Sequence, residues 1–242
     1  MTQTLLRVDG LEARYGAAQI LFGVSLHLDA GEVVAVMGRN GAGKSTTLKA
    51  IMGLIDRRQG RISFLGHDIS RSKPHEIARL GLGFVPEDRR IFPDLTVMEN
   101  LEVGRRAPRA RPDGGADAPW TPERLFELFP NLAEARTRAA GRMSGGEQQM
   151  LTVARTLMGN PHAILLDEPS EGVAPIIVDQ MADMILALKR TGVAILLSEQ
   201  NLPFAALLAE RAYVLERGEI RFQGTMQELG ADEEARRAYL EI

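Results

Sequence analysis

Apolar and polar residues follow two alternating patterns along this chain. Short runs in which every residue is apolar occur at Val33–Met37, Ala163–Leu166 and Val193–Leu197, as expected for strands that are covered on both faces. Between such runs, apolar residues recur at helical spacing, as from Leu48 to Ile55 and in the stretch that begins at Pro175. Strands that alternate with helices in this way predict an α/β protein with a parallel sheet.

Further β-like segments fall outside this alternation. They are short and end at turn residues, which favours antiparallel pairing. These segments are Leu5–Val8, Gly23–Leu28, Gly60–Leu65, and the pair Tyr213–Leu215 and Ile220–Phe222 joined by a hairpin turn at Arg217-Gly218. We therefore expect a second, antiparallel sheet beside the main one.

The stretch from Arg105 to Trp120 differs in composition from the rest of the chain. It is rich in arginine and proline and contains two adjacent glycines, which predicts an irregular loop. Its arginines fit a solvated loop or, alternatively, a contact with lipid headgroups or an acidic partner. They are Arg105, Arg106, Arg109 and Arg111.

The composition limits where the chain can act. Its longest apolar runs are far shorter than the roughly 20 residues that cross a bilayer, and its N-terminus shows no basic stretch followed by an apolar signal segment. The absence of cysteine excludes disulfides and thiol chemistry, the four histidines show no metal-binding spacing, and a net charge of −3 argues against nucleic acid as the main ligand. We expect a cytosolic chain whose role at a membrane depends on a partner.

A phosphate-binding motif follows the first apolar run. Residues 38–45 match G-x-x-x-x-G-K-[ST], a loop that wraps backbone N–H groups around phosphate oxygens. Lys44 supplies a charge at the terminal phosphates, and the Ser45 hydroxyl can ligate Mg²⁺. A glycine turn that merely joins a strand to a helix is the alternative, but the pattern arises by chance in only about one chain per hundred. The expected nucleotide-binding residues are Arg39, Asn40, Gly41, Ala42, Gly43, Lys44, Ser45 and Thr46.

Two carboxylates follow the apolar run Ala163–Leu166. Asp167 and Glu168 end a predicted buried strand, and nucleotide sites lie at the carboxyl ends of parallel strands. We expect Asp167 to hold Mg²⁺ and Glu168 to polarise the attacking water, a role worth about 10²–10⁴ in rate. Alone the pair is weak evidence, but behind a phosphate loop it predicts ATP hydrolysis.

A third motif, Ser144-Gly145-Gly146-Glu147, precedes apolar residues at helical spacing. Ser144 and Glu147 fit a capping box, which needs no ligand. However, two glycines in a first helical turn each cost up to about 1 kcal/mol relative to alanine. The glycines therefore favour an interpretation in which a group such as a phosphate approaches the backbone closely.

With these motifs in this order and at about these spacings, the chain resembles the ATP-binding-cassette (ABC) ATPases. The resemblance implies one domain over residues 1–242: a P-loop NTPase core with a parallel sheet, an added antiparallel β subdomain, and a helical subdomain at 87–159 that carries the signature, Ser144–Glu147. In this family two cassettes meet head to tail, so each ATP lies between one subunit's phosphate loop and the other's signature. Tyr15 falls where the family places an aromatic ring against adenine.

Three further segments, Phe84–Phe92, Glu168–Pro175 and Leu197–Asn201, are similar to those of the LivF-type ATPases of branched-chain amino-acid uptake systems. Close relatives import urea, short amides or other small carboxylates. The resemblance implies a peripheral subunit at the cytoplasmic face of the inner membrane, paired with a second ATPase as a heterodimer, or with itself when isolated. It also implies two permease subunits and, indirectly, a periplasmic or extracellular solute-binding protein, with no nucleic acid.

Three positions depart from the family's general pattern. Glu87 replaces a glutamine that touches Mg²⁺; its carboxylate can still ligate Mg²⁺, but it cannot donate a hydrogen bond while ionised. Gln200 replaces the switch histidine that contacts the γ-phosphate and cannot exchange a proton near neutral pH. Ala174 replaces an aspartate that makes a contact across the dimer. We expect the site on this phosphate loop, with Lys44, Glu168 and Gln200 as its catalytic residues, to be slower or more partner-dependent than one with the usual residues. The second ATPase would then supply the consensus site.

Two other functions stay open from the sequence. A soluble ATP-driven switch usually has a long coiled coil or two cassettes in one chain, and this sequence shows neither. A subunit that binds ATP without splitting it would not need Glu168. For contact with the permease we expect the residues that follow Glu87, although they could simply pack a helix edge: Arg89, Arg90, Ile91 and Phe92.

Overall fold

Two sheets form the framework of this computed structural model, which describes residues 3–109 and 118–239. The strands of the main sheet are β3 (Val33–Met37), β6 (Leu82–Val85), β7 (Ala163–Asp167), β8 (Ala194–Glu199), β9 (Arg211–Glu216) and β10 (Glu219–Thr225), and those of the second sheet are β1 (Thr4–Tyr15), β2 (Ala18–Asp29), β4 (Arg57–Phe64) and β5 (His67–Asp68). Their orders are β10-β9-β3-β8-β7-β6 and β2-β1-β4-β5. The main sheet is parallel except for β10, and the second sheet is antiparallel. The predicted α/β class with an added antiparallel sheet is confirmed.

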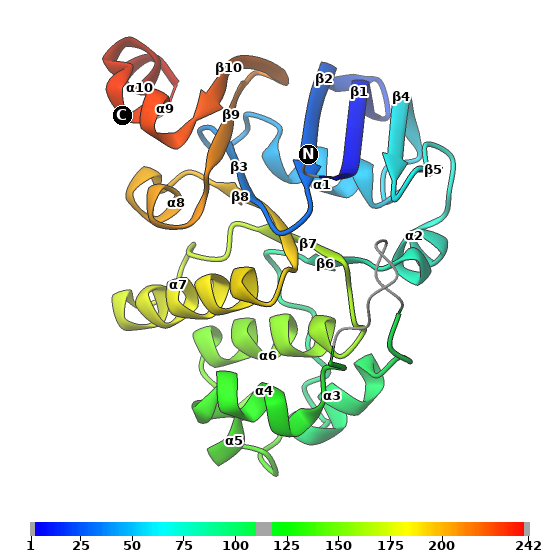
Figure 1. The fold of residues 1–242 in the computed structure, drawn as a ribbon, viewed down its shortest axis with the longest axis vertical. Helices are drawn as coiled ribbons and strands as arrows, with labels where there is room; N and C mark the ends of the chain where they lie inside the picture. The colour runs from blue at the N-terminus through cyan, green and yellow to red at the C-terminus, as the bar shows by residue number, and fades with distance from the viewer. Residues whose placement is uncertain (1–2, 110–117, 240–242) are drawn as a thin grey trace.

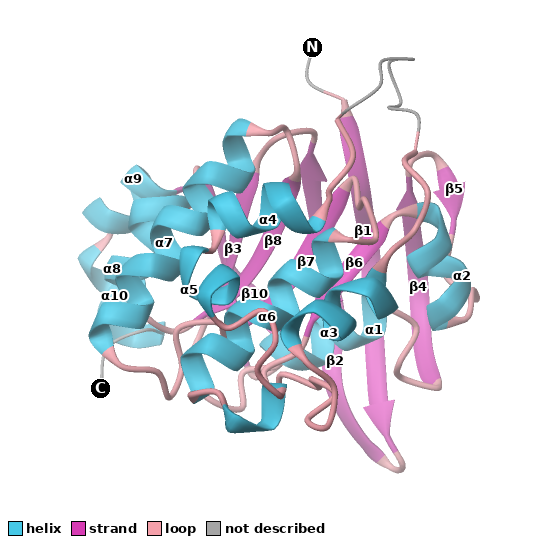
Figure 2. Ribbon diagram, turned by 90° about the horizontal axis from the view of Figure 1, so that it is seen from below, coloured by secondary structure: helices cyan, strands magenta, loops and turns pink. Residues whose placement is uncertain are grey.

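The helices are α1 (Lys44–Ile51), α2 (Pro74–Leu80), α3 (Val97–Gly104), α4 (Pro122–Leu128), α5 (Pro130–Glu134), the 3₁₀ turn η1 (Ala140–Arg142), α6 (Gly145–Leu157), α7 (Pro175–Arg190), α8 (Leu202–Leu208), α9 (Met226–Ala231) and α10 (Glu233–Tyr239). Figure 1 shows α3 to α6 gathered at the end of the molecule away from the antiparallel sheet, and Figure 2 views the molecule from that end. These four helices fall within residues 87–159, the range predicted for the helical subdomain. Among the helices of the described residues, none has the length and apolarity to cross a bilayer.

Alternate residues of β3 face two separate hydrophobic cores, which explains why every residue of this strand is apolar. Val33, Ala35 and Met37 pack with residues of α6, α7 and α8. Val34 and Val36 pack with residues of β1, β2 and α1. Because successive side chains of a strand point to opposite faces, both faces of the main sheet are buried at β3.

The hairpin of β9 and β10 belongs to the main sheet, so its predicted place in the antiparallel sheet was wrong. Strand β9 pairs in parallel with β3. The turn at Gly218, with φ of 80°, nonetheless touches the antiparallel sheet, because the Gly218 carbonyl accepts a hydrogen bond from the Phe22 N–H at 2.9 Å. A Cβ on Gly218 would lie 1.8 Å from the Ile20 carbonyl oxygen, so only glycine fits this turn.

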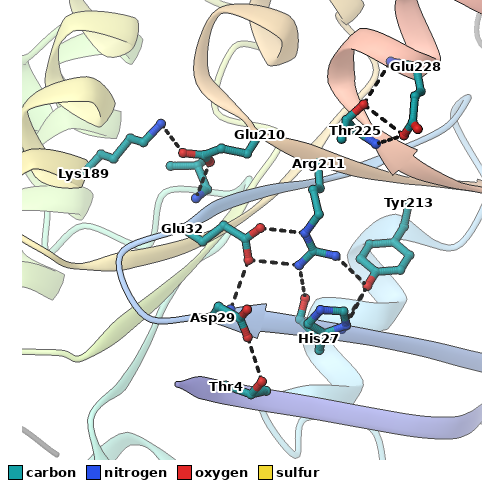
Figure 3. Close-up of polar contacts among 11 residues, drawn as sticks. Thr4, His27, Asp29, Glu32, Lys189, Glu210, Arg211, Tyr213, Thr225 and Glu228 are labelled. Carbon is teal, nitrogen blue, oxygen red and sulfur yellow. Dashed lines mark hydrogen bonds and ion pairs between the residues drawn. The ribbon is translucent and has the colours of Figure 1, made fainter. Parts of the chain in front are cut away.

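A polar network joins β2 to β9 at the edge between the sheets (Figure 3). Arg211 forms an ion pair with Glu32, with nitrogen–oxygen distances of 2.6 and 2.9 Å, and also donates to the His27 carbonyl and the Tyr213 hydroxyl. The same hydroxyl lies 3.1 Å from Nδ1 of His27, and Glu32 accepts the Asp29 N–H. The hydrogen bond to Glu32 raises the pKa of Arg211. The network holds the antiparallel sheet against β9.

We predict that Arg211→Ala lowers the free energy of unfolding by about 1–3 kcal/mol, because it leaves the largely buried Glu32 carboxylate without its cation. Urea denaturation measures this as a lower midpoint with an unchanged slope. The matched control is Arg221→Ala, which breaks the exposed ion pair of Arg221 with Glu219 and should change stability by less than about 0.5 kcal/mol. Equal losses in the two variants would contradict a stabilising role for the network.

Candidate active site

The phosphate loop connects β3 to α1 and is closely surrounded by β2 and the β9–β10 hairpin. Gly43 has φ of 111°, and a Cβ there would lie 2.9 Å from a leucine side chain of β2. A Cβ on Gly38 would lie 2.4 Å from the Leu215 carbonyl oxygen on β9. The Ala42 carbonyl accepts a hydrogen bond from the Gly218 N–H at 2.8 Å. The Leu215 carbonyl therefore requires glycine at position 38, and the positive φ favours it at position 43, in addition to any need for phosphate binding.

The Lys44 ammonium is buried inside the loop and has a partner for each of its three N–H groups. Nζ donates to the carbonyls of Gly38 at 2.7 Å and Arg39 at 3.1 Å. It lies 3.1 Å from Oε1 of Glu168, and the side chains of this ion pair are 2% and 7% exposed. An ammonium has three donors and no acceptor, so this environment satisfies it completely. The structure thus brings together Lys44 and Glu168, as the motifs predicted.

The two predicted acids stand where β7 ends. Asp167 is fully buried; burial raises its pKa, whereas the hydroxyls of Ser198 and Ser45 act in the opposite direction. Burial also raises the pKa of Glu168, against the effect of Lys44. Oδ2 of Asp167 and Oε2 of Glu168 are buried with no hydrogen-bond partner among the described residues. Such oxygens fit a hard cation and a water molecule.

Ser198, at the end of β8, positions both acids, and the sequence motifs did not identify it. Its hydroxyl donates to Oδ1 of Asp167 at 2.8 Å, and its hydroxyl and carbonyl oxygens both accept the Glu168 N–H at 3.1 Å. These bonds hold Glu168 at φ of 45°, a conformation that costs about 1–3 kcal/mol in a residue other than glycine. The available signal was a serine at the end of an apolar strand.

The other predicted nucleotide contacts lie at the margins of this centre. Tyr15 ends β1 and is 49% exposed, and it lines a hollow together with Lys49 and Glu87. Gln200 is exposed directly after β8, and Arg39 donates to a backbone carbonyl of α10 at 3.4 Å. In the described parts of the chain, no three His, Cys, Asp or Glu residues cluster as a ready metal site. The roles of these residues toward ATP stay predictions.

The signature forms the N-terminus of α6, and its capping box is present. The Ser144 hydroxyl accepts the Glu147 N–H at 3.3 Å, and the Glu147 carboxylate accepts the Ser144 N–H at 2.7 Å. A Cβ on Gly145 would lie 2.8 Å from the Arg89 guanidinium, and a Cβ on Gly146 would lie 2.5 Å from Cγ2 of Ile177 on α7. The close approach that the glycines predicted therefore includes two side chains of the same chain.

The segment after Glu87 is held against α6 in an uncommon backbone conformation. Arg89 and Arg90 have φ of 61° and 50°, in the left-handed region that favours glycine. The Thr152 hydroxyl donates to the Arg89 carbonyl at 2.5 Å, and Arg155 donates to the Arg90 carbonyl at 2.6 Å. The segment therefore packs on the edge of α6, which fixes its backbone from two successive turns, and its contact with the permease stays a prediction.

The arginines at the start of the predicted loop are bonded within the chain. Arg105 pairs with Glu102, with two nitrogen–oxygen distances of 2.7 and 2.5 Å. Arg109 is partly buried and donates to the backbone carbonyls of Ala78, Arg79, Gly159 and Asn160. The interpretation of Arg109 as a solvated residue was wrong, because its guanidinium joins the end of α2 to the segment after α6. Arg111 lies outside the described residues.

Comparison with known proteins identifies the family of this chain. A family model described as ABC transporter matches residues 21–171. The chain belongs to the ABC transporter family. As a member of it, the chain is a nucleotide-binding ATPase, and the family predicted from the three motifs is confirmed.

Similar proteins cover almost the full length of the chain. It is 42% identical over 236 residues to the high-affinity branched-chain amino acid transport ATP-binding protein BraG of Pseudomonas aeruginosa, covering 98% of this chain and 99% of BraG. It is 35% identical over 242 residues to the lipopolysaccharide export system ATP-binding protein LptB of Haemophilus influenzae, covering 98% and 97%. The crystal structure of the ADP conformation of MJ1267, an ATP-binding cassette of an ABC transporter, matches with a TM-score of 0.79 at 28% identity and covers 98% of each chain. These matches confirm the ABC ATPase fold.

We predict that the two signature glycines differ in their tolerance of alanine. Gly146→Ala should lower the free energy of unfolding by about 1–3 kcal/mol, because the stiff β-branched side chain of Ile177 cannot move aside. Gly145→Ala should change it by less than about 1 kcal/mol, because the end of the flexible Arg89 side chain can shift and alanine favours the helix. Urea midpoints of the two variants test this. The opposite ranking would show that Ile177 does not limit the site.

Proposed function

We propose that this chain hydrolyses Mg²⁺-ATP to drive the import of a small polar solute, with branched-chain amino acids as the first candidates. The supporting observation is the buried Lys44–Glu168 ion pair beside the open oxygens of Asp167 and Glu168. The terminal phosphates of ATP compete with Glu168 for the ammonium, because both are anions. Once displaced, the Glu168 carboxylate is free to accept a proton from the attacking water.

For Mg²⁺ we propose Ser45, Asp167 and Glu87 as the protein ligands. The open Oδ2 atom of Asp167 and the Ser45 hydroxyl, which acts to lower the pKa of the same side chain, support this assignment. Magnesium binds through one or two carboxylates together with substrate phosphates and waters, so a complete cage of protein ligands is not needed. When bound, the ion neutralises part of the phosphate charge.

The site on this chain is proposed to be half of a complete one. The described hydrogen bonds and ion pair of the Ser144 and Glu147 side chains join these residues to each other and to Arg138, not to the phosphate loop of the same chain. The signature is therefore available to the ATP of a second ATPase, in a heterodimer within the transporter or a homodimer of the isolated chain. We assign Tyr15 to adenine and Gln200 to the γ-phosphate of this chain's own ATP.

A groove bordered by α2, α3 and α6 is the proposed docking site of the permease. Its exposed apolar side chains are Leu54, Phe92 and Val103. Five arginines also line the groove, and no aspartate or glutamate is among its described lining residues: Arg79, Arg90, Arg106, Arg109 and Arg155. Charge complementarity favours an amphipathic permease segment that carries carboxylates beside its apolar face. Docking there would place the chain at the cytoplasmic face of the membrane.

For the cargo, the relation to BraG supports branched-chain amino acids. Urea, short amides and other small carboxylates are the alternative cargoes, and a non-transport ATP switch is the alternative of another class. Uptake of labelled leucine and labelled urea by cells with and without this chain tests the choice. A solute-binding protein would deliver the cargo indirectly, on the opposite side of the membrane.

We predict that Glu168→Gln reduces the rate constant of hydrolysis at the site on this chain's phosphate loop by at least about 100-fold, because glutamine cannot accept the proton of the attacking water. The total ATPase activity of the assembled transporter should fall less than it does with the equivalent change in the second ATPase. ATP binding should persist, since Lys44 and the loop are unchanged. Steady-state hydrolysis and nucleotide binding measure the two effects. Equal losses from this variant and from its equivalent in the second ATPase would contradict the expected asymmetry between the two sites.

We predict that Phe92→Ala weakens assembly with the permease by roughly 10- to 50-fold, because truncation of an aromatic anchor in an interface costs about 2 kcal/mol. The ATPase activity of the isolated chain should not change. Leu207→Ala is the matched control, because Leu207 is 60% exposed on α8 and lies outside the groove. Unchanged assembly and unchanged coupling of transport to hydrolysis in Phe92→Ala would contradict the docking site.

A further inference from the structure

A buried carboxylate beside the proposed site takes no part in the chemistry described so far. Glu199 is the last residue of β8, and the residue is only 1% exposed. Within the part of the chain that the structure describes, it forms no ion pair with lysine or arginine. Burying a carboxylate without a cation is costly unless hydrogen bonds replace its hydration. The contacts that stabilise Glu199 therefore indicate what it does.

The Glu199 carboxylate bridges two loops of the active site. Oε1 accepts the N–H of Ser170 at 3.1 Å, two residues after Glu168. Oε2 accepts the N–H groups of Gln200 at 3.0 Å and Asn201 at 3.1 Å. Burial raises the pKa of Glu199, while its hydrogen bonds with Ser170, Asn201 and Gln200 act in the opposite direction. Each oxygen thus holds the backbone of a different loop.

The strand order explains the position of this carboxylate. Strand β8 lies between β3, which leads to the phosphate loop, and β7, which ends at the two acids. The side chain at the end of β8 therefore lies beside the loop that follows Glu168, while the backbone of Gln200 continues directly from the same strand. Ser198 already fixes the Glu168 backbone from the same strand end.

We propose that Glu199 is a positioning residue for hydrolysis, because it fixes the loop after Glu168 and the backbone of Gln200 relative to each other. This inference rests on the roles proposed above for Glu168 and Gln200. The general base and the side chain that donates a hydrogen bond to the γ-phosphate must both be positioned correctly in the transition state. A misplacement of about 1 Å can cost about 100-fold in rate. Glu199 acts on this geometry through backbone hydrogen bonds and does not touch ATP itself.

The test is Glu199→Gln in the full chain, assembled with its transporter partners. Glutamine keeps the length of the side chain, but its amide nitrogen donates, so at least one of the three N–H groups loses its acceptor. We expect kcat for ATP hydrolysis to fall by about 10- to 100-fold while KM for ATP changes less than about threefold, because the phosphate loop that binds ATP is untouched. Glu199→Ala should lose more, so that glutamine partly rescues the rate.

The matched control is Glu32→Gln, since Glu32 also accepts a backbone N–H and is largely buried but lies in the network of Arg211. It should lower the thermal midpoint and leave kcat unchanged. A loss of kcat in proportion to the loss of stability in both variants would mean that Glu199 is only structural, and would overturn the inference.

A double-mutant cycle with Gln200→Ala separates this inference from the proposed function. If Glu199 acts largely through Gln200, Glu199→Gln should cost less than about threefold in the Gln200→Ala background, because contacting residues are not additive. The full 10- to 100-fold loss in that background would overturn the inference and leave the role of Gln200 intact. An unchanged kcat in Gln200→Ala alone would instead remove the proposed role of Gln200, and the inference with it.

Discussion

The burial of one positive charge sets the arrangement of the active site. The Lys44 ammonium has been removed from water, which is favourable only because two loop carbonyls and the Glu168 carboxylate surround it. Lys44 follows β3 and Glu168 follows β7, and β8 lies between these strands. The ion pair therefore exists only if the parallel strands pair in this order and end at the same edge of the sheet. The Lys44–Glu168 ion pair thus depends on the strand order of the sheet and at the same time forms the centre of the site.

Local patterns of the sequence predicted the parts of this arrangement that depend on neighbouring residues. The strand Val33–Met37, the phosphate loop and the capping box at Ser144 each lie within a few residues, so their spacing identifies them. The position of β8 could not be predicted in the same way, because strand order depends on packing between distant segments. For this reason Ser198 and Glu199 were missed. The hairpin at Gly218 was assigned to the wrong sheet for the same reason, since its own pattern fits either partner.

The glycines of the signature show a second limit of sequence reasoning. A glycine in a helix predicts that something approaches its backbone closely, but not what approaches it. In the structure Gly145 is covered by Arg89 and Gly146 by Ile177. Arg89 belongs to the segment after Glu87, and Ile177 lies on the helix that follows the loop of Glu168. Through these two residues, the segment after Glu87 and the helix after the Glu168 loop both contact the start of α6. The ATP of the partner is proposed to bind there.

The turn at Gly218 bonds to the phosphate loop through its N–H and to β2 through its carbonyl. Strand β2 pairs with β1, which ends at Tyr15. One residue of the hairpin is therefore bonded both to the loop for the phosphates and to the strand that pairs with the one carrying the predicted adenine contact. A substitution in this turn should therefore alter the spacing between the two parts of the predicted nucleotide site, although no atom of the turn needs to touch the nucleotide.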